Sequence, residues 1–571
     1  MDSDLRSIQE ARQLLRAART AAHEAKKLDQ VAVDRIVGAM VRAGASQADR
    51  LGKMAHEETG FGRPESKKAK NLFATETLHE RMEGMRTVGV IRKLENDTIW
   101  EVASPMGVVA ALVPSTNPTS TAMYKAIIAA KSRCAVVMSP HPRAKNCTAA
   151  ALDVVAQAAH KAGAPKGLFA CMTEVSLAGT QALLEDPEVD LILATGGSAM
   201  VKAAYSKGKP AYGVGSGNVP AYVDRSADVA KAAKDLVYGA SFDWGTLCST
   251  ERSIVCDLPV KKALLEGLRA AGAHLVTAKE RPLLEAAVVV NGSLNIEQVG
   301  KSPEAIAEMS GFRVPRGTRA LVAESTVVGS ADPLSRETLS PILTLYTVDG
   351  WEAGCDRCME VLMYGGMGHT LAIHATNERI IEAFAIQKPA MRIVVNSVSA
   401  LGSVGLTTRL FPAMTLGPGT VGGSITSDNI SPLHLLNIKR VAFETSPVTS
   451  RARSTQAQAP QKSGSNMAHR PKKSAPAGGK DSRTSWISEI EDRLRARAGN
   501  PATGAPSASR RGSSSAQRAA PPAQPAAPEQ RAGQAAPPKA GGGGKSDAQP
   551  GSSDGSLSDA SIDALVREFR R

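Results

Sequence analysis

Apolar segments of strand length alternate with helical segments in the first 447 residues, and this alternation restricts the fold most. The runs GVVAALV at 107–113 and CAVVMSP at 134–140 are apolar throughout, and a helical stretch separates them. A third run, DLILATGG at 190–197, ends in a glycine turn before another helical stretch. Strands that are apolar on both faces lie in parallel sheets covered by helices on both sides. The sequence therefore predicts an α/β fold.

The loops after these runs are expected to form a binding rim, because ligands of parallel sheets lie beyond the carboxyl ends of the strands. These loops contain Asn117, Ser139–His141 and Gly196–Ser198. Free backbone N–H groups at Thr195–Ser198 suit a phosphate, although a purely structural glycine turn fits these residues equally well. The segment GVGSGN at 213–218 follows a helix and a predicted tyrosine turn, so it does not read as a dinucleotide fingerprint.

Composition changes near Pro447, where Ala, Pro, Gly, Ser and Gln become dominant. Such a segment buries too little apolar surface to fold, so residues 448–571 are predicted to be a disordered linker. The segment holds 20 Lys/Arg against 10 Asp/Glu and so carries +10 of the formal charge of +14. Its charges are dispersed and its aromatics few, which argues against nucleic-acid binding.

Two short stretches of the tail, near 484–497 and 558–570, have apolar residues at helical spacing. In the second, Ile562, Leu565, Val566 and Phe569 follow a candidate N-cap at Ser558. A short tethered helix is marginal alone, which favours folding on a partner. Docking on the protein's own globular part is the alternative.

Seven cysteines, an odd and scattered set, do not suggest a disulfide framework and favour a reducing compartment. Neither a secretory signal nor an apolar run of the ~18 residues a membrane helix needs is apparent, so a soluble intracellular protein is expected. Judged by its neighbours alone, Cys248 is more readily a small core residue than a nucleophile. Cys256 is predicted to be core, and the Cys355/Cys358 pair lacks further ligands for zinc.

Six segments, in order, resemble the aldehyde dehydrogenase superfamily, and within it the CoA-acylating branch found in ethanolamine- and propanediol-utilising microcompartments. The segments are VPSTNPTST, SPHPRAK, LATGGSAMVKAAYSKGKPAYGVGSGNVPAYVD, FDWGTLCSTER, RETLSPILTLY and GGMGHTLAIH. They span most of the first 447 residues, and the resemblance does not extend into the tail.

The resemblance implies an aldehyde dehydrogenase fold in three parts that forms a homo-oligomer. The expected parts are a Rossmann-like cofactor-binding domain (1–87 and 106–224), an α/β catalytic domain (225–415) and a small β oligomerisation segment (88–105 and 416–447). The tail (448–571) follows this fold. The first helix is expected to pack on the cofactor domain, although Leu5, Ile8 and Leu15 resemble the N-terminal targeting peptides of some members.

The resemblance also implies roles for individual residues. Cys248 corresponds to the nucleophile, and the Asn117 side chain with the Cys248 backbone N–H would hold the oxyanion. His369 would assist proton transfer or organise the CoA thiol, with a packed structural histidine as the alternative. The implied cofactor residues are Thr195, Gly196, Gly197 and Ser198 at the pyrophosphate, Ser139 and His141 at the adenosine ribose, and Glu337 at the nicotinamide ribose. No metal is expected.

One departure from the hydrolytic members of the superfamily bears on the product. Those enzymes carry a water-activating glutamate in an ELGG-type segment, where this chain has GVGSGN, with Gly215 and Ser216. Without a base for water, the CoA thiol is the better nucleophile toward a thioester. The expected reaction is oxidation of a small aldehyde to acyl-CoA with NAD or NADP, between which the SPHP motif does not decide.

The tail resembles an encapsulation peptide at 558–570, with 484–497 as a second candidate. This resemblance implies a cytoplasmic enzyme inside a bacterial microcompartment, with a shell or cargo protein as partner and no membrane association. Two alternatives stay open: a free cytosolic enzyme of the same chemistry, for example on sulfoacetaldehyde, and a non-catalytic scaffold with a binding tail.

Overall fold

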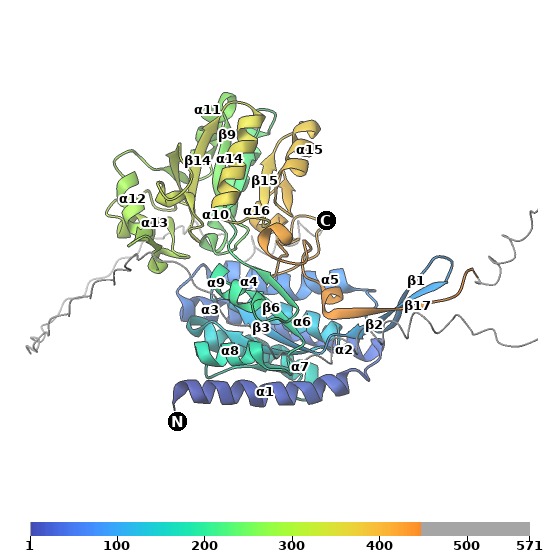
Figure 1. Ribbon diagram of the computed structural model, residues 1–571. Coiled ribbons are helices and arrows are strands. Elements are labelled where there is room, and N and C mark those ends of the chain that lie inside the picture. Colours follow the sequence, from blue (N-terminus) through green and yellow to red (C-terminus); the bar gives the residue numbers. More distant parts are fainter. Residues whose placement is uncertain (1, 447–571) are drawn as a thin grey trace, which may run out of the picture. The chain divides into compact units, whose positions relative to one another are not determined.

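The computed structural model describes residues 2–446, which contain two parallel sheets, a three-stranded antiparallel sheet and a two-stranded antiparallel sheet (Figure 1). The tail stretches 484–497 and 558–570, predicted to be helices, lie outside the described residues. No helix within residues 2–446 combines the length and apolar character needed to cross a bilayer.

The first parallel sheet has the strand order β5-β4-β3-β6-β7. Its strands are β3 (Val108–Val113), β4 (Ala135–Pro140), β5 (Phe169–Cys171), β6 (Leu191–Thr195) and β7 (Ala211–Val214). Every residue of β3 and β4 is buried, as expected for strands covered on both faces. The three apolar runs are thus confirmed as neighbouring parallel strands.

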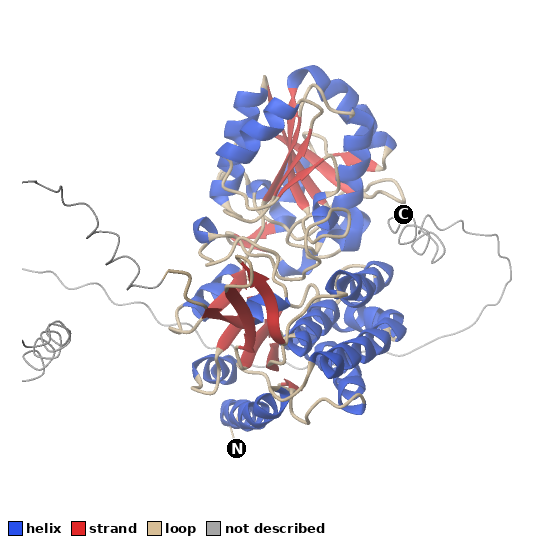
Figure 2. Cartoon of the chain, turned by 90° about the vertical axis from the view of Figure 1, so that its right-hand side faces the viewer, coloured by secondary structure: helices blue, strands red, loops and turns tan. Residues whose placement is uncertain are grey.

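Helices cover both faces of this sheet, because the strand order reverses after β5 and right-handed crossovers then fall on the opposite side (Figure 2). Helices α6 (Pro118–Lys131) and α7 (Lys145–Lys161) pack together with α2 (Gln30–Ser46). Helix α1 (Ser3–Ala25) lies along α8 (Leu177–Glu185) and against β3 and β4. The first helix therefore packs on the predicted cofactor domain.

The second parallel sheet has seven strands in the order β10-β13-β14-β9-β8-β15-β16. They are β8 (Val219–Val223), β9 (Glu251–Asp257), β10 (Ala273–Leu275), β13 (Ala320–Ser325), β14 (Ile342–Val348), β15 (Leu371–His374) and β16 (Ile393–Val395). The helices around it include α10 (Val229–Ser241), α11 (Lys261–Ala270), α14 (Trp351–Tyr364) and α15 (Glu378–Gln387). Cys256 is fully buried in β9, as predicted.

Two details of the sequence interpretation are wrong. The expected cofactor-binding segment runs to residue 224, but β8 pairs with β9 and β15, so the chain crosses between the sheets at residues 215–218. An apolar run such as that of β8 fits either sheet equally well. The GVGSGN segment begins inside β7 (Ala211–Val214) and does not follow a turn; this four-residue edge strand is too short to show a pattern in the sequence.

The three-stranded antiparallel sheet consists of β1 (Gly89–Leu94), β2 (Ile99–Pro105) and β17 (Leu436–Ala442), with β2 in the middle. The antiparallel segment near 88–105 is therefore present, and the returning strand is β17. Figure 1 shows these three strands extending away from the parallel sheets.

The remaining α-helices and strands are mostly short. They are α3 (Ala48–Thr59), α4 (Pro64–Leu72), α5 (Leu78–Met82), α9 (Ser198–Tyr205), α12 (Arg281–Val288), α13 (Pro303–Met309), α16 (Ser399–Gly402), β11 (Val289–Val290) and β12 (Ser293–Leu294).

Two buried helix glycines give a matched test of this packing. A Cβ at Gly354 in α14 would lie 2.4 Å from the Tyr222 ring, which is itself stacked on Phe384. A Cβ at Gly38 in α2 would meet only the mobile end of Arg42, at 3.3 Å. We expect Gly354→Ala to lower the free energy of unfolding by about 1–3 kcal/mol, because a packed ring must move.

Gly38→Ala should raise the free energy of unfolding by up to about 1 kcal/mol, since alanine favours the helix and restricts the unfolded chain. Urea or thermal unfolding of the two variants measures both effects. Equal effects of the two substitutions would contradict the close approach of α14 to β8.

Candidate active site

Cys248 lies in a turn between α10 and β9, on a loop with unusual backbone geometry. Asp243 and Trp244 have φ values of 49° and 48°, and Gly245 follows at 72°. Two consecutive non-glycine residues in the left-handed region are strained and need support from their surroundings. The contacts of this loop therefore decide where Cys248 sits.

Arg252, the second residue of β9, stabilises the loop through hydrogen bonds to backbone carbonyls. Its guanidinium is buried and donates to the carbonyls of Gly245 and Leu247, the latter at 3.3 Å. It also donates to the Ser340 carbonyl at 2.8 Å, which joins the loop to the segment that enters β14. A planar guanidinium with several donors holds such a set of carbonyls in fixed geometry.

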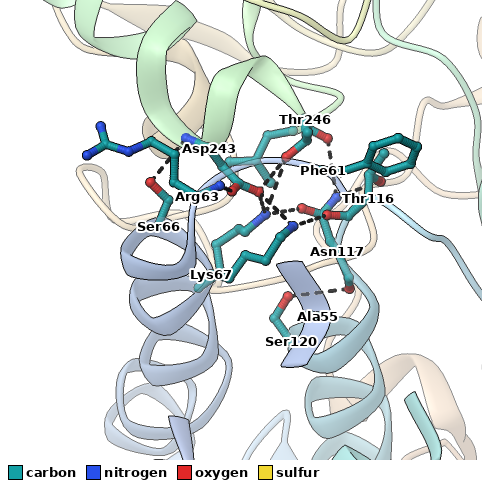
Figure 3. Close-up of polar contacts among 12 residues, drawn as sticks. Ala55, Phe61, Arg63, Ser66, Lys67, Thr116, Asn117, Ser120, Asp243 and Thr246 are labelled. Carbon is teal, nitrogen blue, oxygen red and sulfur yellow. Dashed lines mark hydrogen bonds and ion pairs between the residues drawn. The ribbon is translucent and has the colours of Figure 1, made fainter. Parts of the chain in front are cut away.

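Asn117 occupies the N-cap position of α6, and its carboxamide is fixed on both sides (Figure 3). Its Oδ1 accepts a hydrogen bond of 2.5 Å from Lys70 Nζ. Its Nδ2 donates to Thr116 Oγ1 at 3.0 Å and, more weakly, to the Thr246 carbonyl at 3.4 Å. The amide nitrogen thus faces the loop that carries Cys248.

A buried carboxylate joins α4 to this loop. Asp243 is fully buried and binds the ammonium groups of Lys67, at 3.3 Å, and of Lys70. Burial opposes ionisation of Asp243, but the two ammonium groups outweigh it and lower its pKa. Burial lowers the pKa of Lys70 to about 8, although Asp243 counteracts this shift. Figure 3 shows how these side chains converge from α4 and the loop.

A groove runs along the carboxyl ends of β3, β4 and β6 and ends at Cys248. It consists of two adjoining pockets that share Pro114, His141 and Thr195–Gly197. The outer pocket also contains Ser139 and Leu177, and the inner one contains Asn117, Cys248 and Glu337. The predicted rim over the strand ends is therefore a continuous groove.

The middle of the groove has the properties of a phosphate-binding turn. Gly197 caps α9 without a side-chain hydrogen bond, and a Cβ on Gly196 or Gly197 would meet open space. The first N–H groups of α9 are therefore accessible to an anion. Ser198 Oγ contacts Ser216 Oγ at 3.2 Å across the turn. The residues present thus fit a dinucleotide laid along the groove.

Two residues of the outer pocket already have hydrogen-bond partners. Ser139 Oγ bonds Thr180 Oγ1 at 2.8 Å, and His141 Nδ1 accepts from the Arg143 N–H at 3.1 Å. Burial and the charge of Arg143 lower the pKa of His141. Both side chains keep further acceptor or donor capacity for a ribose.

Glu337 lies at the inner end of the groove and influences the cysteine. Its Oε1 accepts from the Gly217 N–H at 3.2 Å, and burial raises its pKa while Arg252 counteracts this. Burial, together with the negative charge of Glu337, raises the pKa of the Cys248 thiol to about 12, against the opposing charges of Arg392 and Arg252. Without a ligand, Cys248 is therefore a thiol rather than a thiolate.

His369 is buried behind the groove and lines neither pocket. Its Nδ1 bonds Thr370 Oγ1 at 2.9 Å, while Nε2 has no hydrogen-bond partner among the described residues. Burial and Arg392 lower its pKa to about 3, so the imidazole is neutral. A Cβ at Gly217 would lie 3.0 Å from this ring and 2.1 Å from the Cys248 carbonyl oxygen, so Gly217 separates the two residues.

The structure brings most of the sequence-predicted residues together. Those lining the groove are Asn117, Ser139, His141, Thr195, Gly196, Gly197, Cys248 and Glu337. Ser198 adjoins the groove, and His369 lies behind it. Sequence reasoning missed Lys67, Lys70, Asp243, Arg252 and Arg392. The one available signal was the i, i+3 spacing of Lys67 and Lys70, which does not reveal a contact 173 residues away.

The fold, with a groove over the strand ends that terminates at a cysteine, is that of the aldehyde dehydrogenases. The chain belongs to the aldehyde dehydrogenase family, whose sequence model matches residues 5–352.

Curated relatives include bifunctional and acylating enzymes. The bifunctional aldehyde-alcohol dehydrogenase of Escherichia coli K12 is 38% identical over 441 residues, which cover 76% of this chain and 50% of that protein. The chain thus spans about half the length of the bifunctional relatives it matches. The acylating sulfoacetaldehyde dehydrogenase of Cupriavidus necator is 36% identical over 431 residues, covering 74% and 87%.

Solved structures agree with this assignment. An acetylating aldehyde dehydrogenase from Geobacillus thermoglucosidasius has 47% identity and a TM-score of 0.77, covering 78% of this chain and 99% of that one. A propionaldehyde dehydrogenase from the fucose-utilisation microcompartment of Clostridium phytofermentans has 25% identity and a TM-score of 0.70, covering 77% and 98%. One from Rhodopseudomonas palustris, with bound CoA and an acylated cysteine, has 27% identity and a TM-score of 0.69, covering 76% and 97%.

The influence of Glu337 on Cys248 is testable by alkylation. Glu337→Gln removes the negative charge that raises the pKa of Cys248, so the thiolate fraction should increase. We expect iodoacetamide to modify Cys248 about three- to tenfold faster at pH 9, as measured by mass spectrometry of its peptide. Cys171, which lies at β5 and is also only partly buried, is the internal control and should react at an unchanged rate. An unchanged rate at Cys248 would exclude this electrostatic effect.

Proposed function

We propose that this protein is a CoA-acylating aldehyde dehydrogenase that oxidises a small aldehyde with NAD(P)+ and transfers the acyl group to CoA. The observation that carries the proposal is the position of Cys248, which lines the inner groove beside the Asn117 amide. Bound in the groove, the oxidised nicotinamide would supply the hydride acceptor of the reaction. Thr195–Ser198, Ser139, His141 and Glu337 would hold the dinucleotide.

The first step is attack of the Cys248 sulfur on the aldehyde carbonyl. Because the thiol is protonated in the free protein, it must lose its proton before or during the attack. The carbonyl oxygen becomes an oxyanion, which the Asn117 Nδ2 and the Cys248 backbone N–H would receive as donors. Oxidation of this adduct leaves an acyl thioester on the sulfur of Cys248.

The second step is release of the acyl group to the thiol of CoA. At the segment where hydrolytic relatives activate water, this chain has Gly215 and Ser216. Among the described residues lining the two pockets, Glu337 is the one carboxylate, and it is engaged by the Gly217 N–H. Water therefore lacks a dedicated base, whereas a thiol attacks a thioester readily. Because a pKa of about 3 makes His369 a weak proton acceptor, its proposed role is to organise the CoA thiol through Nε2, which has no partner within residues 2–446.

Two similar proteins support this proposal. The Rhodopseudomonas palustris enzyme contains CoA and an acylated cysteine, and the Cupriavidus necator enzyme is an acylating dehydrogenase. The names of the similar proteins include acetylating, propionaldehyde and sulfoacetaldehyde enzymes. We therefore propose a short aldehyde as the substrate.

The reaction is tested by absorbance of the reduced cofactor at 340 nm with acetaldehyde or propionaldehyde. We expect many turnovers only when CoA is present, and a loss of at least about 1,000-fold in Cys248→Ala, because the covalent intermediate cannot form. Steady turnover without CoA would show that water reaches the thioester. Inactivity over a broad aldehyde panel would favour the non-catalytic scaffold instead.

We also propose that the enzyme is a homo-oligomer that works inside a bacterial microcompartment. The open edge strand β17 and the exposed side chains of Val441 and Phe443 offer a surface for a second copy. The sequence at 558–570 predicts an amphipathic helix on a long linker, and a microcompartment enzyme is among the similar structures. A shell or cargo protein would be its partner.

Encapsulation is tested with a fluorescent protein fused to residues 554–571, expressed in cells that assemble microcompartments. We expect fluorescence to co-purify with the shells, because the apolar helical face needs a partner groove. The matched control carries Leu565→Glu and Phe569→Glu and should remain outside. Equal distribution of the two fusions would favour the free cytosolic enzyme, such as one acting on sulfoacetaldehyde.

A further inference from the structure

The ammonium of Lys70 lies directly behind the amide that faces the cysteine loop. Lys70 projects from α4, is 4% exposed, and contacts Asp243, Asn117 Oδ1 and, at 3.5 Å, Thr246 Oγ1. Placing an ammonium in such a site is costly unless each of its protons finds an acceptor. These three acceptors match its three N–H donors.

Lys70 fixes the orientation of the Asn117 carboxamide, because an ammonium group can only donate hydrogen bonds. The Asn117 atom 2.5 Å from Lys70 must therefore be the oxygen, which turns the NH₂ group toward Thr246 and the groove. A carboxamide without such a partner could rotate and present its oxygen to the oxyanion instead. That orientation would be repulsive where negative charge develops.

The same cluster carries excess positive charge. Two buried ammonium groups, from Lys67 and Lys70, face the single carboxylate of Asp243. Lys67 donates its other hydrogen bond to the Thr116 carbonyl at 3.2 Å and does not contact Asn117. Only Lys70 is turned toward the proposed oxyanion donor. The pKa of Lys70, about 8, leaves it mostly protonated at neutral pH.

Asp243 links both proposed oxyanion donors to α4. It accepts hydrogen bonds from Thr246 Oγ1 at 2.5 Å and from the Arg63 N–H at 2.7 Å. Thr246 lies two residues before Cys248, whose N–H is the second donor. One ion pair therefore fixes the side chain of Asn117 and the backbone that leads to Cys248 (Figure 3).

We propose that Lys70, anchored by Asp243, is a positioning residue that holds the Asn117 NH₂ toward the thiohemiacetal oxyanion. This inference rests on the proposed aldehyde dehydrogenase function. Lys70 does not touch the substrate; it acts through Asn117.

The inference is tested by a double-mutant comparison in the full chain, using the aldehyde that wild type oxidises best with NAD(P)+ and CoA. Lys70→Met should lower kcat about 10- to 100-fold with the aldehyde KM changed less than about threefold, because only the transition state loses stabilisation. Asn117→Ala should cost about 100- to 1,000-fold. In the Asn117→Ala background, Lys70→Met should cause no further loss beyond about twofold.

Lys67→Met is the matched control, since it removes the other ammonium from Asp243 without a contact to Asn117. Its effect on kcat should be the same in the presence and absence of the Asn117 side chain. Alkylation of Cys248 by iodoacetamide needs no oxyanion donor and should proceed at similar rates in wild type and Lys70→Met. The alkylation rate thus reports whether the loop is intact.

An unchanged kcat in Lys70→Met, or a further loss in the Asn117→Ala background, would overturn the inference. If Lys70→Met does not fold, Lys70→Gln replaces it in the same comparison. If wild type oxidises no aldehyde, the proposed function fails, and a crystal structure of Lys70→Met still decides the inference. An Asn117 side chain that keeps its wild-type position in that structure refutes the positioning role, and a displaced one supports it.

Discussion

The ion pair between Asp243 and the two buried lysines of α4 is the interaction on which the active-site loop depends. Asp243 is in the left-handed region, followed by Trp244 and Gly245, so the loop needs external contacts to keep its shape. Removing the carboxylate would leave two ammonium groups buried without a counter-charge, which is costly. Arg252 also holds the loop, through hydrogen bonds to two of its carbonyls. The cysteine is thus held by charges that do not themselves line the groove.

The two parallel sheets contribute different parts of the site. The first sheet offers the ends of β3, β4 and β6 as a polar groove, and the second carries Cys248 just before β9. The chain passes between them at residues 215–218, beside the cysteine. In that crossing, Gly217 donates its N–H to Glu337 and lies against the Cys248 carbonyl. A short backbone segment thereby couples the cofactor side of the groove to the nucleophile.

The sequence predicted β3, β4 and β6 because strands buried on both faces are apolar at every position. It also predicted that the loops after them converge, since parallel strands share one carboxyl edge. It did not predict the sheet to which β8 belongs, because its apolar run suits either. Cys248 alone was ambiguous, and only the ordered motifs around it indicated a nucleophile. The sequence did not reveal the cluster around Asp243. Its partners, Lys67 and Lys70, are more than 170 residues away in the chain, and no local sequence pattern indicates such a contact.

The crowding around the crossing segment also bears on how easily the reaction outcome could change by mutation. A Cβ at Gly213 would lie 2.7 Å from Val201 of α9, and one at Gly217 would lie 2.1 Å from the Cys248 oxygen. A substitution at either position would therefore displace α9 or the cysteine loop, whereas a Cβ at Gly215 would meet only Ser198, 3.1 Å from its Oγ. Within this segment, the room for a new side chain thus lies at Gly215, and a change of acyl acceptor by substitution would have to begin there.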